Sequence, residues 1–250
     1  MTVRNPLAVA ALVVLALMAF LAVSAPWLGT VAPTAVNPLN RLRPPSAEAW
    51  MGTDMLGRDL WSRVVYGSRV SLFVAAMVAI LSTAIGFVIG LVAGFLRGVD
   101  SVVMRIMDGL MSIPSLLLAI ALMALTGASV RNVILAIVVA ETPRVARLIR
   151  GVVLSLRDQL YVDAAIASGT RTHMIILRHI VPNAVAPLIV QGTYIFAAAM
   201  TIEAALSFIG AGTPSSTPSW GNIMSEGKAL FQLHPQFVLI PALFLSLTIL

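Results

Sequence analysis

Cysteine is absent from the 250 residues, and charged residues make up only 10% of them. Without cysteine the chain has no disulfide framework, no thiol nucleophile and no cysteine metal site. Hydrophobic residues reach 59%, which is more apolar surface than a single soluble core can bury. The composition therefore predicts an integral membrane protein.

Nucleotide and metal motifs are missing as well. The only Gly-Lys pair is Gly227-Lys228, and a phosphate loop would need Gly at the position of Asn222 and Ser or Thr at that of Ala229. We therefore expect no ATP binding, no metal and no enzymatic activity in this chain. The histidines follow no metal-ligand spacing: His173, His179 and His234.

Apolar runs of about 20 residues are abundant, and a helix of that length crosses roughly 30 Å of hydrocarbon. Charge, Pro and Gly bound these runs. They predict one all-α integral membrane domain over residues 1–250, with a C-terminus that we expect to be truncated, because the last run is short for a crossing. The expected spans are Leu7–Trp27, Val70–Phe95, Met107–Thr126, Val130–Leu148, Ala184–Phe208 and Pro235–Leu250.

Six spans put both termini on one side of the membrane. With Arg4 and the N-terminus inside, the Lys/Arg count is nine inside against seven outside, a small bias toward this orientation. The net charge of +6 lies in short loops, which favours lipid headgroups over nucleic acid as its partner. The tryptophans fall in or at the edges of the outer segments: Trp27, Trp50, Trp61 and Trp220.

Small residues recur every four positions along the second expected span. Such a stripe lets another helix backbone approach closely in lipid, where no hydrophobic effect drives helix association. It predicts a packing face, either within this chain or against another subunit. The stripe consists of Ser82, Gly86, Gly90 and Gly94.

Few ionisable residues interrupt the expected spans, and such residues are candidates for function. They are Asp108, Glu141 and Glu203. Glu203 lies about 20 residues into its helix, near the outer interface. We favour a solvated or hydrogen-bonded structural carboxylate there, with a direct functional role within the membrane as the alternative.

The longest inner segment, residues 157–182, has a distinctive local pattern. It reads as a short Ala-rich helix that begins near Tyr161, a turn at Gly169, which can take the left-handed conformation, a second helix within Thr170–Ile180 and a stop at Pro182. Small side chains beside an acidic residue leave a flat face that a partner's groove can accept. We interpret this helix-turn-helix as a docking surface outside the membrane.

The same segment resembles the "EAA" loop of ABC importer permeases. In that loop an acidic residue and two Ala precede a Gly, and a hydrophobic-Pro pair follows about a dozen residues later. Asp replaces the usual Glu here, which keeps the charge and shortens its reach. The matching positions are Asp163, Ala164, Ala165, Gly169, Val181 and Pro182.

Three further stretches resemble the dipeptide, oligopeptide and nickel permeases: Gly52–Arg69, Ala204–Gly210 and Pro218–Asn222. In the first, the glycines suggest tight turns, and we favour a structural or outer-gate role over substrate contact. Its motif residues are Gly52, Thr53, Asp54, Leu56, Gly57, Arg58 and Asp59.

The resemblance implies a membrane-spanning subunit of an ATP-driven importer in the bacterial inner membrane, with both termini cytoplasmic. It would form half of a pathway for di- or oligopeptides, beside a homologous second permease, two ATP-binding subunits that hold ATP and Mg, and an outer solute-binding protein. The segment Asp163–Gly169 would be the coupling helix. Transport of nickel or another small solute, or a self-contained secondary carrier, are the alternatives.

Overall fold

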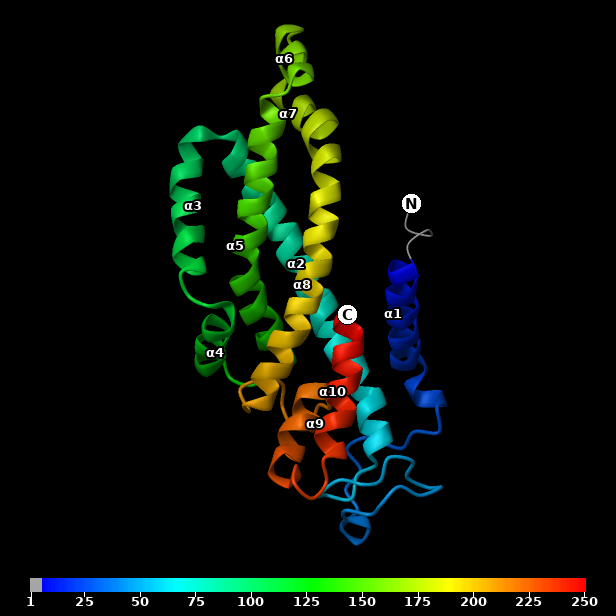
Figure 1. Ribbon diagram of the computed structural model, residues 1–250. Coiled ribbons are helices and arrows are strands. Elements are labelled where there is room, and N and C mark those ends of the chain that lie inside the picture. The colour runs from blue at the N-terminus through cyan, green and yellow to red at the C-terminus, as the bar shows by residue number, and fades with distance from the viewer. Residues whose placement is uncertain (1–5) are drawn as a thin grey trace. The chain divides into compact units, whose positions relative to one another are not determined.

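The computed structural model describes residues 6–250, and within them the chain is helical, with a single isolated bridge between Thr53 and Asp59 in place of any sheet. This confirms the predicted all-α class. Arg4, which entered the charge count, lies outside the described residues. The elements follow in this order (Figure 1): α1 Pro6–Ser24, η2 Ala25–Trp27, η3 Pro38–Asn40, α2 Leu60–Phe95, α3 Arg97–Met111, α4 Ser115–Thr126, α5 Val130–Arg157, α6 Leu160–Ala167, α7 Thr172–Ile175, η4 Ile176–Ile180, α8 Val181–Phe208, α9 Trp220–Gly227, η5 Lys228–Leu230 and α10 Gln236–Ile249.

Three helical stretches within residues 6–250 are long and apolar enough to cross a membrane: Ala8–Trp27, Leu60–Phe95 and Thr172–Phe208. The pair α3 and α4 adds a fourth if it counts as one broken span. Helix α5 is long but carries several charged residues, and α10 is an apolar helix of 14 residues. A topology of six spans therefore stays a prediction.

Two helices extend well beyond their apolar runs. Helix α2 begins at Leu60, ten residues before the expected span, because the carboxylate of Asp59 accepts the N–H of Ser62 at 2.8 Å and caps the first turn. Helix α5 continues to Arg157, whose guanidinium donates to the Gly94 carbonyl at 2.9 Å. The charged residues at these ends have hydrogen-bond partners, so each helix can continue past the end of its apolar run.

The stretch expected as one span over Met107–Thr126 lies in two helices. Helix α3 ends at Met111, α4 begins at Ser115, and their axes bend by 88°. The physical reason is Pro114, which disfavours helical backbone at the residue before it and cannot donate a backbone hydrogen bond.

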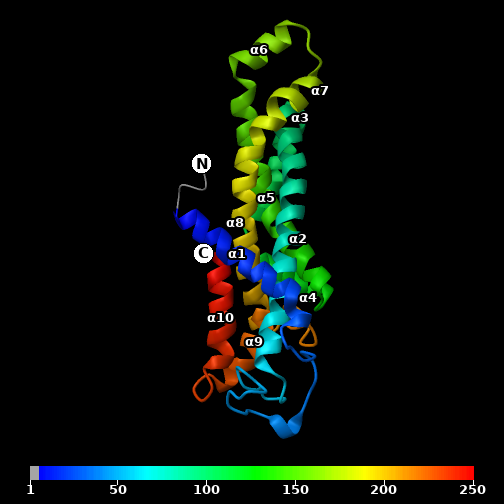
Figure 2. The ribbon, with the colours of Figure 1, turned by 90° about the vertical axis from the view of Figure 1, so that its right-hand side faces the viewer.

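The described chain divides into two compact units. The first contains the residues up to Ala76 together with Met123–Ile134 and Ala197–Leu250, and the second contains Met77–Leu122 and Leu135–Phe196. In the first unit, α10 packs against α9 and touches α1. In the second, α6 and α7 stand at one end of the helices α5 and α8 (Figures 1 and 2).

The small-residue stripe of α2 faces α5 in the second unit. A Cβ atom built on Gly86 would lie 2.5 Å from the Cβ of Val145, and one on Gly90 would lie 2.5 Å from the carbonyl oxygen of Ala146. Ser82 is fully buried on the same face. The stripe thus brings two backbones closer than larger side chains allow, and the contact lies within this chain. Its members are Ser82, Gly86, Gly90 and Gly94.

Ion pairs attach α3 to the other side of α5, beside which it lies (Figure 1). The guanidinium of Arg150 donates to both carboxylate oxygens of Asp100, at 2.5 and 2.6 Å. Arg147 pairs with Asp108, one of the ionisable residues expected within a span. Because the Arg150–Asp100 pair makes two parallel hydrogen bonds, it is the stronger of the two ion pairs and sets the position of α3 along α5.

Replacing Gly90 with Leu tests the close approach of α2 and α5. We expect the free energy of unfolding to fall by about 1–3 kcal/mol, because the new side chain meets the backbone of Ala146, which cannot move without displacing α5. The measurement is the unfolding equilibrium of the detergent-solubilised protein. Gly109→Leu is the matched control, since a Cβ at this helical glycine meets nothing within 4 Å. Equal losses in the two variants would contradict the packing.

Candidate functional site

The outer motif, Gly52–Asp59, which is named for its expected side of the membrane, forms a compact loop before α2, and two of its glycines are required there. Gly52 and Gly57 have φ of 78° and 71°, the left-handed region. A Cβ on Gly57 would lie 1.8 Å from the carbonyl oxygen of Asn37. The Thr53 hydroxyl closes the loop by accepting the N–H of Arg43 at 2.9 Å.

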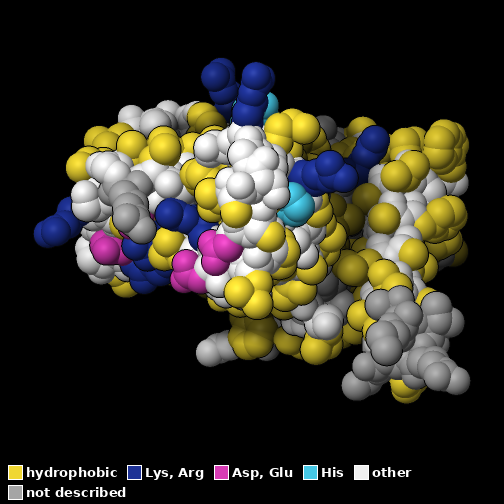
Figure 3. Space-filling model, turned by 90° about the horizontal axis from the view of Figure 1, so that it is seen from above, with side chains coloured by type: hydrophobic (Ala, Val, Ile, Leu, Met, Phe, Trp, Pro, Cys, Tyr) yellow, Lys and Arg dark blue, Asp and Glu magenta, His cyan; other side chains and the backbone are white. Residues whose placement is uncertain are grey.

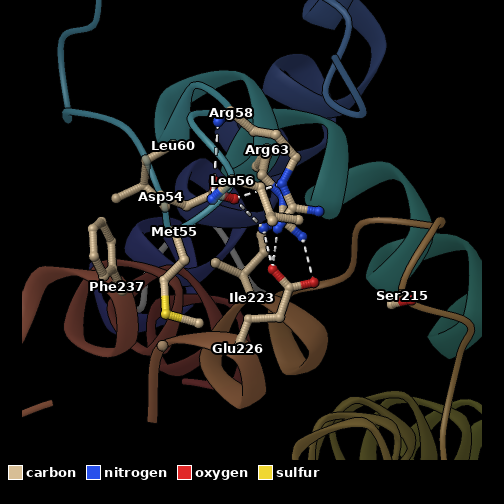
Figure 4. A pocket seen from close by; sticks show the side chains of 11 residues that line it. Asp54, Met55, Leu56, Arg58, Leu60, Arg63, Ser215, Ile223, Glu226 and Phe237 are labelled. Carbon is tan, nitrogen blue, oxygen red and sulfur yellow. Dashed lines mark hydrogen bonds and ion pairs between the residues drawn. The ribbon is translucent and has the colours of Figure 1, made fainter. Parts of the chain in front are cut away.

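Asp54 is the centre of this loop (Figure 4). Its Oδ1 accepts the backbone N–H groups of Leu56 at 2.8 Å and Arg58 at 3.0 Å. Its Oδ2 accepts the side chains of Arg58 at 2.6 Å and Arg63 at 2.7 Å. One carboxylate therefore fixes both the turn and the two guanidinium groups.

Glu226, from α9, completes the cluster from a distant part of the sequence. It pairs with Arg58 and with Arg63, and its Oε1 accepts the Nη2 of Arg63 at 3.1 Å. The side chain of Arg63 is 2% exposed and that of Asp54 9%. Two cations and two anions balance, so the cluster can stay buried without an unpaired charge.

A cavity of about 280 Å³ lies beside this cluster (Figure 4). Its other walls are largely apolar, with Met55, Leu60, Ile223 and Phe237 among them. Because the two cations and two anions pair with one another, the cavity offers little net charge to a ligand, although Nε of Arg63 is buried without a hydrogen-bond partner among the described residues. Among residues 6–250, no group of three or more His, Asp or Glu is arranged to hold a metal ion.

Glu203 on α8 is completely buried in the first unit. Its two oxygens accept the hydroxyls of Ser207, on the same helix, at 2.9 Å and of Ser71, on α2, at 3.3 Å. The Ser71 oxygen in turn accepts the backbone N–H of Trp220 at 3.3 Å. The carboxylate therefore links α8, α2 and the start of α9 through hydrogen bonds rather than through an ion pair.

Trp220 fills the space between these helices and is fully buried. Its indole Nε1 donates to the carbonyl of Val64 on α2 at 3.1 Å. Gly67 leaves room for it, since a Cβ there would lie 3.3 Å from the Trp220 ring. Two stretches singled out in the sequence, one near residue 67 and one near 220, thus meet in the first unit.

The inner segment forms the expected helix and glycine turn. Helix α6 ends at Ala167, and Gly169 follows with φ of 74°. The N–H of Gly169 donates to the carbonyl of Ile166 at 2.9 Å, and that of Thr170 to Ala165 at 3.0 Å. This pair of bonds is the Schellman motif, which satisfies the last carbonyls of a helix through a left-handed glycine.

Helix α6 is largely exposed. The exposed fraction is 85% for Leu160 and 59% for Ile166, and Asp163 and Ala164 are exposed between them. Buried Val162 holds the helix to the rest of the second unit. Figure 3 looks onto this end of the molecule and shows basic and acidic side chains among apolar ones. An exposed face of mixed apolar and acidic character suits a protein partner.

The expected stop at Pro182 is wrong. Helical backbone continues from Thr172 to Phe208, and Val181 and Pro182 form the first turn of α8. The five residues before them, Ile176–Ile180, form a π-helix. This wider turn accommodates a proline that lacks a backbone donor, so the helix continues through it.

Comparisons with known proteins agree with these features. Residues 86–250 match the family model described as binding-protein-dependent transport system inner membrane component. The chain belongs to this family of ABC importer permeases. Residues 2–45 also match the N-terminal TM domain of oligopeptide transport permease C. The resemblance to ABC importer permeases that the sequence motifs indicated is thereby confirmed.

Relatives of this permease cover almost all of it. A probable peptide ABC transporter permease protein of Sinorhizobium fredii is 45% identical over 99% of this chain and 84% of its own length. The dipeptide transport system permease protein of Alkalihalophilus pseudofirmus is 40% identical over 99% and 82%. The oligopeptide transport system permease protein of Bacillus subtilis is 36% identical over 98% and 80%.

Solved structures support the fold of the permease. An inward facing crystal form of the MetNI methionine ABC transporter aligns with a TM-score of 0.57 at 18% identity, over 76% of this chain and 92% of that one. A second crystal form aligns with a TM-score of 0.52 at 17% identity, over 71% and 88%. The family match, together with the apolar helices, makes the permease a multi-pass protein of the inner membrane.

Sequence reasoning missed Arg63 and Glu226 as partners of the outer motif. They lie 163 residues apart, and Glu226 belongs to a different outer segment. The only sequence signal that could have paired Arg63 with Glu226 was that both lie in segments expected on the outer side of the membrane. The structure brings Asp54 and Arg58 together as well, whereas Asp59 caps α2 instead of joining the cluster.

Replacing Glu226 with Gln tests whether the cluster holds the outer loop to α9. We expect the free energy of unfolding to fall by about 2 kcal/mol, because Arg58 and Arg63 then share a single carboxylate in a buried site. Thermal unfolding of the purified permease measures the loss. Glu48→Gln is the control, since Glu48 is exposed and forms no ion pair within the described chain. An unchanged unfolding midpoint for Glu226→Gln would contradict the role.

Proposed function

We propose that this permease forms half of the pathway through which an ATP-driven importer moves di- or oligopeptides delivered by a solute-binding protein. The names of its relatives, which are peptide, dipeptide and oligopeptide permeases, support the substrate class. The observation that carries the mechanism is the exposed helix α6, closed by the Gly169 turn, at the end of α5.

Helix α6 is the coupling helix in this proposal. Its exposed apolar side chains, Leu160 and Ile166, would enter a groove of an ATP-binding subunit, and small Ala164 would allow a close approach. Asp163 adds a negative charge in the first turn, where it also favours the helix dipole. The Gly169 turn returns the chain sharply, so that α6 protrudes as a compact unit. Val181 and Pro182 belong to the helix that carries the chain back.

Movement of α6 would reach the membrane through the helices on either side of it. Helix α5 leads into α6, and α7 leads out toward α8. Because α5 packs against the glycine stripe of α2, α2 and α5 would move as one body in the second unit. ATP binding in the partner would then bias two arrangements of this body, one open inward and one open outward.

The remaining components lie in partner subunits. This sequence lacks a phosphate loop, so ATP and Mg would bind two ATP-binding subunits, and the permease itself would hold no cofactor. A homologous second permease would supply the other half of the pathway as a heterodimer. Both termini and α6 would then face the cytoplasm, and the loop around Asp54 would face outward, where its buried ion pairs suit a rigid frame for the outer gate.

Glu203 has a structural role in this proposal. Both of its oxygens accept hydroxyl groups, and its burial leaves no surface for a solute. The carboxylate would hold the outer end of α8 against α2 and α9. The alternative, a direct role in the pathway, requires that these three helices separate during transport.

Two substitutions test the coupling assignment. Asp163→Arg reverses the charge on the docking face, and Gly169→Leu forces a side chain into a backbone conformation with φ of 74°. We expect either change to reduce ATP-driven peptide uptake by about tenfold or more, because losing roughly 1.4 kcal/mol of a coupled contact has that effect. Uptake into proteoliposomes that contain the complete importer is the measurement.

Gly210→Leu is the matched control for Gly169→Leu. Gly210 has φ of 86° and open space around it, so the substitution brings similar backbone strain at a turn away from α6. This control should keep most of its uptake. Normal uptake by both α6 variants would contradict the coupling role, and ATP-independent uptake by the isolated permease would favour a secondary carrier.

A further inference from the structure

A second polar cluster joins α5 and α8 within the second unit. The Nη1 of Arg144 donates to Oε2 of Glu141 at 3.0 Å and to the hydroxyl of Tyr194 at 3.3 Å. The guanidinium carbon also lies 5.5 Å from the centre of the Tyr194 ring, within the range of a cation–π contact. The cluster therefore fixes one cation between a carboxylate and an aromatic ring.

Burial within the cluster is uneven. Glu141 is fully buried, whereas the side chain of Arg144 is 40% exposed and Tyr194 is 54% exposed. The carboxylate thus holds the guanidinium from the inside, and the opposite edge of the guanidinium stays open. Such an arrangement orients a cation toward a ligand instead of neutralising it on all sides.

The open side of the cluster offers hydrogen-bond donors. Nε and Nη2 of Arg144 have no partner within residues 6–250, and the Tyr194 hydroxyl accepts from Arg144, which leaves its own proton available. A guanidinium edge with two donors matches the two oxygens of a carboxylate. The tyrosine hydroxyl can add a third bond. The chemistry therefore selects an anion, and a carboxylate fits best.

The position along the helices limits what this anion can be. Arg144 and Tyr194 lie on the middle turns of α5 and α8, and Arg144 falls within the expected span Val130–Leu148, four residues before its inner end. Ionisable side chains within membrane spans face a bundle interior or a water-filled cavity. A solute that crosses the membrane passes this position.

Unpaired polar atoms also occur on the helices that surround this cluster. Oε1 of Glu141, Oγ of Ser82 and Nε2 of Gln191 are buried without a hydrogen-bond partner within the described chain. They belong to α5, α2 and α8, the helices of this part of the second unit. Buried polar atoms are usually hydrogen-bonded, so water, an ion or a passing solute would satisfy these three.

We propose that Arg144 and Tyr194 bind the C-terminal carboxylate of the peptide during translocation, with Glu141 as the positioning residue that holds the guanidinium. This inference rests on the proposed peptide function. It gives the permease a selectivity of its own, which acts after delivery by the solute-binding protein.

The test compares each peptide with its C-terminal amide, which lacks the carboxylate but keeps the same length and side chains. The complete importer is reconstituted with the binding protein saturated by either form. We expect Arg144→Gln to lower the ratio of free-acid to amide uptake by about tenfold, through a higher apparent KM for the free acid. Arg144→Lys should restore part of the ratio, and Tyr194→Phe should lower it less.

Arg147→Gln is the matched control, one turn further along α5, where the arginine pairs with exposed Asp108. Its ratio should equal that of the unaltered permease. An unchanged ratio in Arg144→Gln, or an equal loss of both peptide forms, as expected if Arg144 pairs with the second permease, would overturn the inference. If the unaltered importer carries neither form, the proposed peptide function fails and the inference fails with it.

Discussion

The close approach of α2 and α5 is the contact on which the rest of the second unit depends. Lipid provides no hydrophobic drive for helix association, so contact relies on backbones that can come close together. The glycines at positions 86 and 90 provide this, because a Cβ at either would overlap α5. Once α5 is fixed, its end positions α6, and its middle positions Arg144 against Tyr194.

Charge balance is the second constraint, and the chain meets it by pairing. The outer loop sets Asp54 and Glu226 against two arginines, and α3 is joined to α5 through Asp100 and Arg150. A charged group can be buried only when it finds a partner, as Asp54 and Arg63 do. Arg144 differs, because its guanidinium is anchored on one side and open on the other. That asymmetry separates a binding group from a structural pair.

The sequence predicted those features that depend on neighbouring residues. The all-α class follows from the apolar runs, and the turn at Gly169 follows from a glycine after an Ala-rich helix; the structure confirms both. The predicted helix stop at Pro182 was wrong because a π-helix just before it accommodates the proline. The link from Arg63 to Glu226 was out of reach, since it joins segments 163 residues apart and no periodic pattern records it.

A cross-link between α2 and α5 tests the central claim that they move as one body. The chain contains no cysteine, so the double variant Gly94→Cys and Val153→Cys introduces the only thiols. The Cβ positions lie 2.8 Å apart, and a small shift reaches the roughly 3.5–4.5 Å of a disulfide. The account predicts that the disulfide forms with and without nucleotide, and that oxidised importer retains peptide uptake. A disulfide that forms in one state only, or that blocks uptake until it is reduced, would contradict it.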